Sequence, residues 1–336
     1  MTAVPLWIHQ VLLNTFAVLS ISSNSLLIFL VTHPTSRNLG HYRVLLCTFA
    51  TVDMTISLFH ASIIPVFVQA EFGFVIFAFN TLNLPERLGY AANEFYCILF
   101  YEPFILLMFH FFYRLMSVVS PESLRVHFKK GVAVSIIINA AIALMITADV
   151  WLIYPEIDEN FFAEVLMAEY EINLHRIPKP NTIPVHYVVS IEHAPGFGSG
   201  PNWDSILSML NCGALGFATI VFNVVCGSII IKAVKNRQMQ VQLFRALVIQ
   251  FTIPVLFCVL PFFLIVGLPA TGINFGQAGN MLGFVVSAFP VIDPICMILA
   301  YSRFRSVVAH FFREVFIHAE PTIVHSKPPS SFALSR

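Results

Sequence analysis

Charged residues are scarce in this chain of 336 residues. Asp, Glu, Lys and Arg together make up 11% of it, and their formal charges sum to zero at pH 7. Soluble domains carry about 25% charged residues, so the composition argues against a soluble protein. Without an excess of positive charge there is also no electrostatic reason to bind a polyanion, and we expect no nucleic-acid partner.

Motifs that carry catalytic chemistry are missing as well. The sequence has no cluster of His, Cys and Asp with metal-site spacing, no glycine-rich phosphate loop and no credible nucleophile–base pair. We therefore expect no enzymatic activity, no metal and no cofactor. Asn-x-Ser/Thr sequons are absent, and no basic stretch precedes the first apolar run, so we expect neither N-glycosylation nor a cleavable signal peptide.

Long apolar segments dominate the chain instead. Hydrophobic residues make up 57% of it, and Phe alone occurs 34 times. A helix rises about 1.5 Å per residue and a bilayer core is about 30 Å thick, so about 20 apolar residues suffice to cross it. The segments long enough to do so are about 6–31, 44–69, 95–119, 131–153, 205–231, 246–268 and 276–300.

Basic residues gather on one side of these segments. Arg87, Arg176 and Lys179 lie on the same side as the N-terminus. All the others lie on the opposite side: Arg37, Arg43, Arg114, Arg125, Lys129, Lys130, Lys232, Lys235, Arg237, Arg245, Arg303, Arg305, Arg313, Lys327 and Arg336. Lys and Arg are retained in the cytoplasm. We therefore predict an all-α membrane protein, a seven-transmembrane helix bundle with the N-terminus outside and the C-terminus cytoplasmic, which is the topology of G-protein-coupled receptors.

The longest connection between spans, about 154–202, is acidic and becomes rich in Pro and Gly toward its end. Its first part, Asp158 to Ile172, is compatible with a short helix, and Ile183–Ile191 alternates as a strand does. The loop is therefore either a lid over a ligand site or a solvated connection. It contains no Cys, so Cys97 at the outer end of the third span is either free or paired elsewhere.

Apolar residues recur at helical spacing after the seventh span, between Arg303 and Arg313. This pattern predicts an amphipathic helix over about 302–316 that lies on the inner leaflet. We therefore assign residues 1–316 to the membrane domain. The tail, 317–336, is rich in Pro and Ser and is predicted to be disordered.

Polar residues at mid-membrane mark a first candidate site. Asn24, Asp53 and Asp293 fall at comparable depths in the first, second and seventh spans, with Pro294 next to the last of them. A carboxylate inside a membrane needs a partner. The three groups therefore form either a structural network that couples the helices or a site that holds a cation or a proton.

Two further polar groups lie at the two ends of the third span. Glu102, in its outer half, either recognises a ligand or pairs with a neighbouring helix. The same two roles are open to Asp149 in the fourth span, and for Asp149 we favour pairing with a neighbouring helix. At the inner end, Tyr113 is followed by Arg114. This Arg either contacts the inner ends of other helices and a partner protein, or extends toward the lipid headgroups.

Several short motifs occur in a characteristic order. They are Asn24–Leu27, Leu39–Leu46, Phe49-Ala50 with Asp53, His60–Pro65, Phe111–Arg114, Gln242–Gln250 leading to Ile253-Pro254 and Leu260-Pro261, Phe289–Pro294 and Tyr301–Arg305. Together, over about residues 6–312, they resemble the nematode serpentine chemoreceptors of the Str superfamily, which includes the class r and class j groups. Rhodopsin-like motifs match only in part, because Tyr113 replaces the acidic residue before Arg114.

This resemblance implies a chemosensory G-protein-coupled receptor, in the plasma membrane of sensory cilia, for a small odorant, tastant or pheromone. We expect a ligand pocket lined by Tyr101, Glu102, Phe104, Phe263 and Phe275. We expect a heterotrimeric G protein to contact Tyr113, Arg114, Lys235, Arg237 and Arg245. The alternative is a seven-span ligand-gated channel or transporter, in which Asp53 and Asp293 relay ions.

Overall fold

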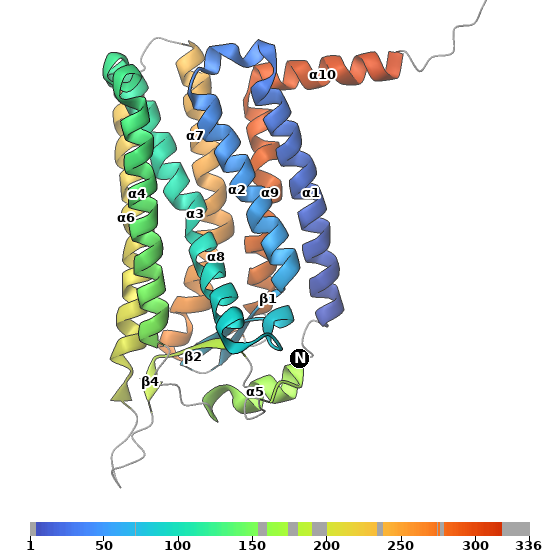
Figure 1. Ribbon diagram of the computed structural model, residues 1–336, viewed down its shortest axis with the longest axis vertical. Helices are drawn as coiled ribbons and strands as arrows, with labels where there is room; N and C mark the ends of the chain where they lie inside the picture. Colours follow the sequence, from blue (N-terminus) through green and yellow to red (C-terminus); the bar gives the residue numbers. More distant parts are fainter. Residues whose placement is uncertain are drawn as a thin grey trace, which may run out of the picture.

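A bundle of membrane-spanning helices forms the body of the protein (Figure 1). The computed structural model describes residues 5–70, 72–153, 160–173, 181–189, 200–233, 238–273, 275 and 279–317. Among these residues, 7 helical segments are long and apolar enough to cross a membrane, which confirms the predicted fold class. They are α1 (Leu6–Thr32), α2 (Tyr42–Ile63), α3 (Glu86–Val119), α4 (Pro121–Ile153), α6 (Trp203–Ala233), the sixth span (Phe244–Thr271) and α9 (Gly279–Ala300).

The second span is shorter than the apolar run that predicts it. The prediction extends the helix to about residue 69, but α2 ends at Ile63, and Ile64 takes a left-handed conformation with φ 53°. Pro65, which cannot donate a helical hydrogen bond, then opens strand β1 (Pro65–Ala70). The run stays apolar because the strand is as deeply buried as the helix, and composition alone does not distinguish the two.

A small sheet covers the outer end of the bundle. Strand β2 (Gly73–Ala78) pairs antiparallel with β1 on one side and with β3 (Thr182–His186) on the other. Within the predicted strand-like stretch, Val188–Val189 forms β4 and pairs with β5 (Gly200–Pro201). The sheet lies at the same end of the bundle as the N-terminus (Figure 1), which is the outer end in the predicted topology.

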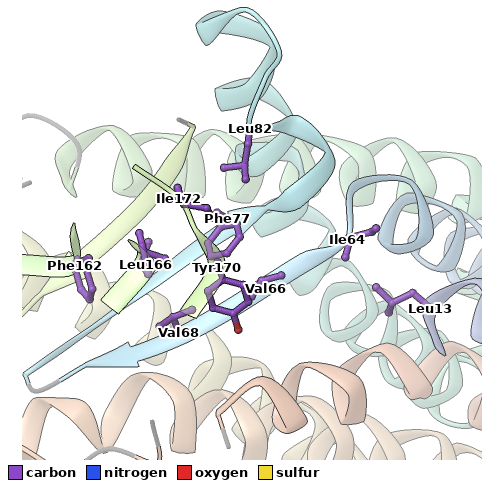
Figure 2. Close-up of a cluster of buried hydrophobic side chains, with 11 residues drawn as sticks. Leu13, Ile64, Val66, Val68, Phe77, Leu82, Phe162, Leu166, Tyr170 and Ile172 are labelled. Carbon is purple, nitrogen blue, oxygen red and sulfur yellow. The ribbon is translucent and has the colours of Figure 1, made fainter. Parts of the chain in front are cut away.

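The sheet is apolar on both faces because both faces are covered. Val66, Val68 and Phe77 point away from the bundle and pack against helix α5 (Asn160–Tyr170), as Figure 2 shows. Alternate residues, such as Phe74 and Ile183, point the other way and join the core of the bundle. The predicted helix in the long outer loop is thus confirmed, and it seals the sheet from outside. We call the three-stranded sheet and α5 together the lid.

The sixth span is irregular along its length. After α7 (Gln238–Pro254) come a π-helical turn (Val255–Val259), a short α-helical turn α8 (Leu260–Phe262) and a second π-helical turn (Phe263–Gly267). Pro254 and Pro261 each remove one backbone donor, and wide turns of this kind accommodate such interruptions. The structure therefore gives this span two weak points.

Helix α10 (Ser302–Ile317) follows the last span and projects sideways from the inner end of the bundle, roughly perpendicular to the spans (Figure 1). Phe304 is buried against the bundle while Arg303 and Arg305 are exposed, which confirms the predicted amphipathic helix. The tail that we predict to be disordered lies outside the described residues, apart from Ile317.

Candidate functional site

A cavity lies between the lid and the helices, with a volume of about 80 Å³. A water molecule needs roughly 10–15 Å³ on this measure, so the cavity has room for several waters or for part of a small ligand. The lid contributes one wall, and α3, α4, α6 and the sixth span contribute the others. The lining residues include Phe67, Phe74, Ile183, Val185, Tyr96, Phe100, Tyr101, Ile146, Asp149, Met209, Cys212, Phe262 and Ile265.

Polar groups are few in this cavity, and they are already engaged. The Asp149 carboxylate, 5% exposed, accepts two hydrogen bonds from Asn211 Nδ2, at 3.0 and 2.8 Å. The Tyr101 hydroxyl donates to the Cys212 carbonyl at 3.3 Å. Since the Asp149 carboxylate and the Tyr101 hydroxyl each have a partner on the neighbouring helix, the surface presented to a ligand is mainly aromatic and aliphatic.

The structure divides the residues that the sequence nominates for the ligand pocket. Tyr101 lines the cavity, whereas Phe104 and Phe263 line a separate crevice beside α6. Glu102 faces α4 instead, where Asn139 Nδ2 donates to its carboxylate at 2.9 and 3.1 Å. Phe275 is 46% exposed at the outer surface, away from the cavity lining.

Asp149 and the lid residues are the part of the cavity that sequence reasoning did not assign. Asp149 lines the cavity and also pairs with Asn211 of the neighbouring helix α6, as we favoured for it, whereas Glu102, which we expected in the ligand pocket, lies outside the lining. The rotation of each helix about its axis, which depends on packing, decides this. The strand residues Phe67 and Phe74 come from the connection after α2. The signals for a lid in the sequence are the length of the loop 154–202, its short predicted helix and the alternation around Ile183, and none of them points to β1 or β2.

Side chains of the lid are hydrogen-bonded to the outer end of the sixth span. Gln69 Nε2, on β1, donates to the carbonyls of Leu264 and Ile265, both at 2.9 Å. The Tyr187 hydroxyl donates to the carbonyl of Val266 at 2.8 Å. Carbonyls near the end of a helix lack helical donors, so the lid supplies the partners that this end requires. Burial raises the pKa of Tyr187, which therefore keeps its proton and acts as a donor.

The lid is also fixed to α3 and α9. Asn181, just before β3, donates to the carbonyls of Thr81 and Leu84, and its own carbonyl accepts from Asn93 of α3. Gly89 allows this approach, since a Cβ atom there would lie 1.9 Å from the Asn181 amide nitrogen. On α9, the Asn280 side chain accepts from the backbone N–H of Phe67 at 3.0 Å. The lid is thus an integral part of the bundle.

The mid-membrane group predicted from the sequence comes together around a proline. Pro294 has no N–H, so the carbonyl of Pro290, four residues earlier in α9, has no helical donor. Asn24 Nδ2 donates to that carbonyl at 3.0 Å and Ser20 Oγ does so at 3.2 Å. Both donors belong to α1. They join the first and seventh spans at the point where the α9 backbone is interrupted.

Two carboxylic acids lie in the same layer of the bundle. Asp53 is fully buried and Asp293 is 1% exposed, and the two groups are close enough to interact electrostatically. None of their carboxylate oxygens has a hydrogen-bond partner among the residues that the structure describes. Two neighbouring buried carboxylates cannot both be ionised without a counter-charge. The pair therefore needs a proton or a cation. These are the two occupants that the sequence analysis names for a site in this layer.

At the inner end of α3, Arg114 is buried against aromatic rings. It is 6% exposed, and its guanidinium carbon lies 3.7 Å from the centre of the Tyr42 ring on α2. Tyr113 stacks on the same Tyr42 ring, with 5.8 Å between the two ring centres. Arg114 Nε and Nη2 have no hydrogen-bond partner in the described part of the chain. Arg114 therefore points into the bundle and not toward the headgroups.

The remaining basic residues that we predict to face a G protein are only partly described. Arg245 is exposed on the first turns of the sixth span. Lys235 and Arg237 lie outside the described residues.

Comparison with known proteins identifies the family. The family model of the serpentine-type seven-transmembrane G-protein-coupled chemoreceptor Str matches residues 9–309. The chain belongs to the Str family of chemoreceptors. This Str-family receptor is 27% identical to serpentine receptor class r-10 of Caenorhabditis briggsae over 86% of each protein. It is 25% identical to class r-10 of Caenorhabditis elegans over 82% of each.

Among solved structures, the receptor resembles squid rhodopsin, with a TM-score of 0.59 over 95% of this chain and 89% of that one. The identity between them is 12%, so the likeness shows a shared fold alone. The matched family region contains the lid, the cavity and the buried Arg114. This Str-family receptor is therefore a multi-pass membrane protein of a chemosensory G-protein-coupled class.

Proposed function

We propose that this receptor binds a small, mainly apolar odorant, tastant or pheromone in the cavity under the lid and activates a heterotrimeric G protein. The observation that carries the proposal is the cavity whose lid is hydrogen-bonded to the outer end of the sixth span. A cavity with aromatic walls and engaged polar groups suits a ligand with little charge. Tyr101 supplies the aromatic wall on α3.

The signal passes from the cavity to the sixth span. Ile265 lines the cavity with its side chain, and its carbonyl accepts a hydrogen bond from Gln69 of the lid. A ligand that moves the lid therefore also moves this end of the span, whose two π-helical turns provide places to bend. The ligand shifts the population only if it binds the bent arrangement more tightly than the straight one.

At the inner end, the same movement frees Arg114. Separation of the inner ends of the helices withdraws the Tyr42 ring from its guanidinium and exposes both to a G protein. Tyr113 lies beside them, and Arg245, Lys235 and Arg237 belong to the adjacent connection. The polar layer of Asn24, Asp53, Asp293 and Pro294 acts as the conformational switch between the two ends.

The proposed partners and location follow from the family. They are a small volatile or pheromone-like molecule outside, a heterotrimeric G protein inside and the plasma membrane of chemosensory neurons, in their sensory cilia. Membership of a chemoreceptor family supports all three.

The test is ligand-evoked G-protein activation in a heterologous cell. The receptor is screened with volatile and pheromone-like libraries beside the variant Arg114→Ala. Arg125→Ala is the matched control, because Arg125 is exposed on α4 and pairs only with the exposed Glu122 at 3.4 Å among the described residues. We expect Arg114→Ala to abolish the response and Arg125→Ala to keep it, at equal surface expression. An evoked current that survives both G-protein blockade and Arg114→Ala contradicts the proposal and favours a channel.

A further inference from the structure

The outer route into the cavity is blocked. Phe74, Ile183 and Val185, which form its outer wall, are 1%, 3% and 1% exposed. The opposite face of the sheet is covered by α5, whose Phe162 and Leu166 are 1% and 0% exposed. Water outside the cell is therefore separated from the cavity by two packed layers of side chains.

A crevice opens beside the cavity on the flank of the bundle, between α6 and the sixth span. Its α6 side is formed by Gly213 and Gly216. A Cβ atom at either glycine would meet no atom within 4 Å, so the gap is real space next to bare backbone. Phe263, on the other side of the crevice, is 50% exposed on a surface that lies within the membrane span. The crevice therefore faces lipid.

The crevice and the cavity share a wall of side chains: Phe100, Tyr101, Cys212 and Phe262 line both of them. The ring centres of Phe100 and Phe262 are 5.3 Å apart, and Phe262 belongs to α8, the short turn between the two π-helical turns. Rotation of this one ring on an irregular part of the span connects the two spaces. Helix α6 packs mainly on α3 and α4 and touches α7 only slightly, so little packing opposes a small separation there.

We propose that ligands reach the cavity from the bilayer, through the crevice beside Gly213 and Gly216 and past Phe262, and that they are uncharged, lipid-soluble molecules. The proposal rests on the proposed role of the cavity as the ligand site. A charged molecule would have to shed its hydration along a path of aromatic rings and glycine backbone, which is costly. A neutral apolar molecule is instead concentrated in the bilayer at the entrance.

The test measures the rate of entry with a short, uncharged alkyl diazirine as the probe. The full-length receptor in lipid nanodiscs is mixed with the probe and photolysed at increasing delays, and the label on Tyr96 is read by mass spectrometry. Tyr96 lines the cavity and not the crevice. The rate at which its label approaches the plateau reports the route, and the plateau itself reports the capacity of the cavity.

Gly216→Leu and Gly213→Leu fill the crevice, and Ala218→Leu is the matched control because Ala218 is exposed on the same helix and lies outside the crevice. We expect each glycine variant to slow the approach by about tenfold or more, because the probe must then displace the leucine side chain that occupies the crevice, while Ala218→Leu leaves it unchanged. An equal plateau in all variants shows that the cavity is intact.

Unchanged rates in both glycine variants overturn the route, and so does an absence of label on Tyr96 in the wild type. A charged diazirine of the same size that labels Tyr96 as fast as the neutral one overturns it too. Labelling needs no G protein, so the two proposals fail separately. Entry through the crevice without any ligand-evoked signalling contradicts the proposed function alone.

Discussion

Replacing Tyr42 by Leu tests the inner end of the mechanism. The substitution removes the ring over which the Arg114 guanidinium lies at 3.7 Å and leaves an apolar side chain in its place. Arg114 then remains in a buried site without its aromatic partner, since its Nε and Nη2 have no hydrogen-bond partner in the described chain. We expect the closed arrangement to lose stability relative to the open one, and basal signalling to rise.

The size of the effect follows from burial. A cation over an aromatic ring contributes about 0.5–1 kcal/mol at exposed sites and about 2 kcal/mol when desolvated. Arg114 is 6% exposed, so the larger value applies. A loss of about 2 kcal/mol shifts the equilibrium by about 30-fold, which raises an open population of about 1% to about 20%.

The assay is agonist-free G-protein activation in membranes, normalised to receptor number. Tyr42→Phe is the matched control because it keeps the ring and removes only the hydroxyl, and we expect it to signal at close to the wild-type basal level. Equal basal activity in Tyr42→Leu and Tyr42→Phe, with both folded and at the surface, would refute the reasoning.

Four further variants test the cavity, the lid and the polar layer. Ile183→Trp fills the cavity from the lid, and we expect at least a tenfold loss of agonist potency in dose–response curves with basal activity unchanged. Gln69→Leu breaks the hydrogen bonds to the sixth span, so we expect a lower maximal response at similar ligand affinity. Asn24→Ala leaves the Pro290 carbonyl with one donor, which costs about 1–2 kcal/mol and lowers the melting temperature by a few degrees. Asp53→Asn removes a buried ionisable group, so we expect an equal or higher melting temperature in thermal unfolding.

Three of these variants have a control on an exposed site. For Ile183→Trp the control is Leu210→Trp, which adds the same bulk to the exposed face of α6, where Leu210 is 63% exposed. For Asn24→Ala and Asp53→Asn the controls are Ser22→Ala and Asp204→Asn, which change exposed side chains of α1 and α6. Potency that falls equally in Leu210→Trp contradicts the cavity assignment. A full response in Gln69→Leu, a melting temperature for Asn24→Ala no lower than that of Ser22→Ala, or a clear loss of stability in Asp53→Asn contradicts the corresponding prediction.

The spans could be predicted from the sequence because they depend on a one-dimensional quantity, and the predicted direction rests on another. An apolar run is long enough to cross the bilayer or it is not, and Lys and Arg stay on the cytoplasmic side wherever the chain later packs. The depth of Asn24 and Asp293 in their spans is set in the same way, by counting residues from the inner ends. The hydrogen bond from Asn24 to the Pro290 carbonyl was therefore close to predictable, given the missing donor of Pro294.

The ligand cavity depended on packing and was only partly predictable. Residues 44–69 form one apolar run, yet the chain changes from helix to strand at Ile64 because β1 finds a partner in β2 and a cover in α5. Strand β3, which completes the lid, comes from more than a hundred residues further along the chain. No local pattern records such a pairing.

Packing also decided which of the two carboxylates, Glu102 or Asp149, lines the cavity. Asp149 lies near the outer end of α4 and Glu102 lies midway along α3, and the sequence fixes only how deep each carboxylate lies. Which direction a side chain faces depends on how its helix is rotated against its neighbours, and that is decided by the packing of α3, α4 and α6 together. Hydrophobic length and charge placed the helices in the membrane, and only the packed tertiary structure decided which of their side chains enclose a cavity.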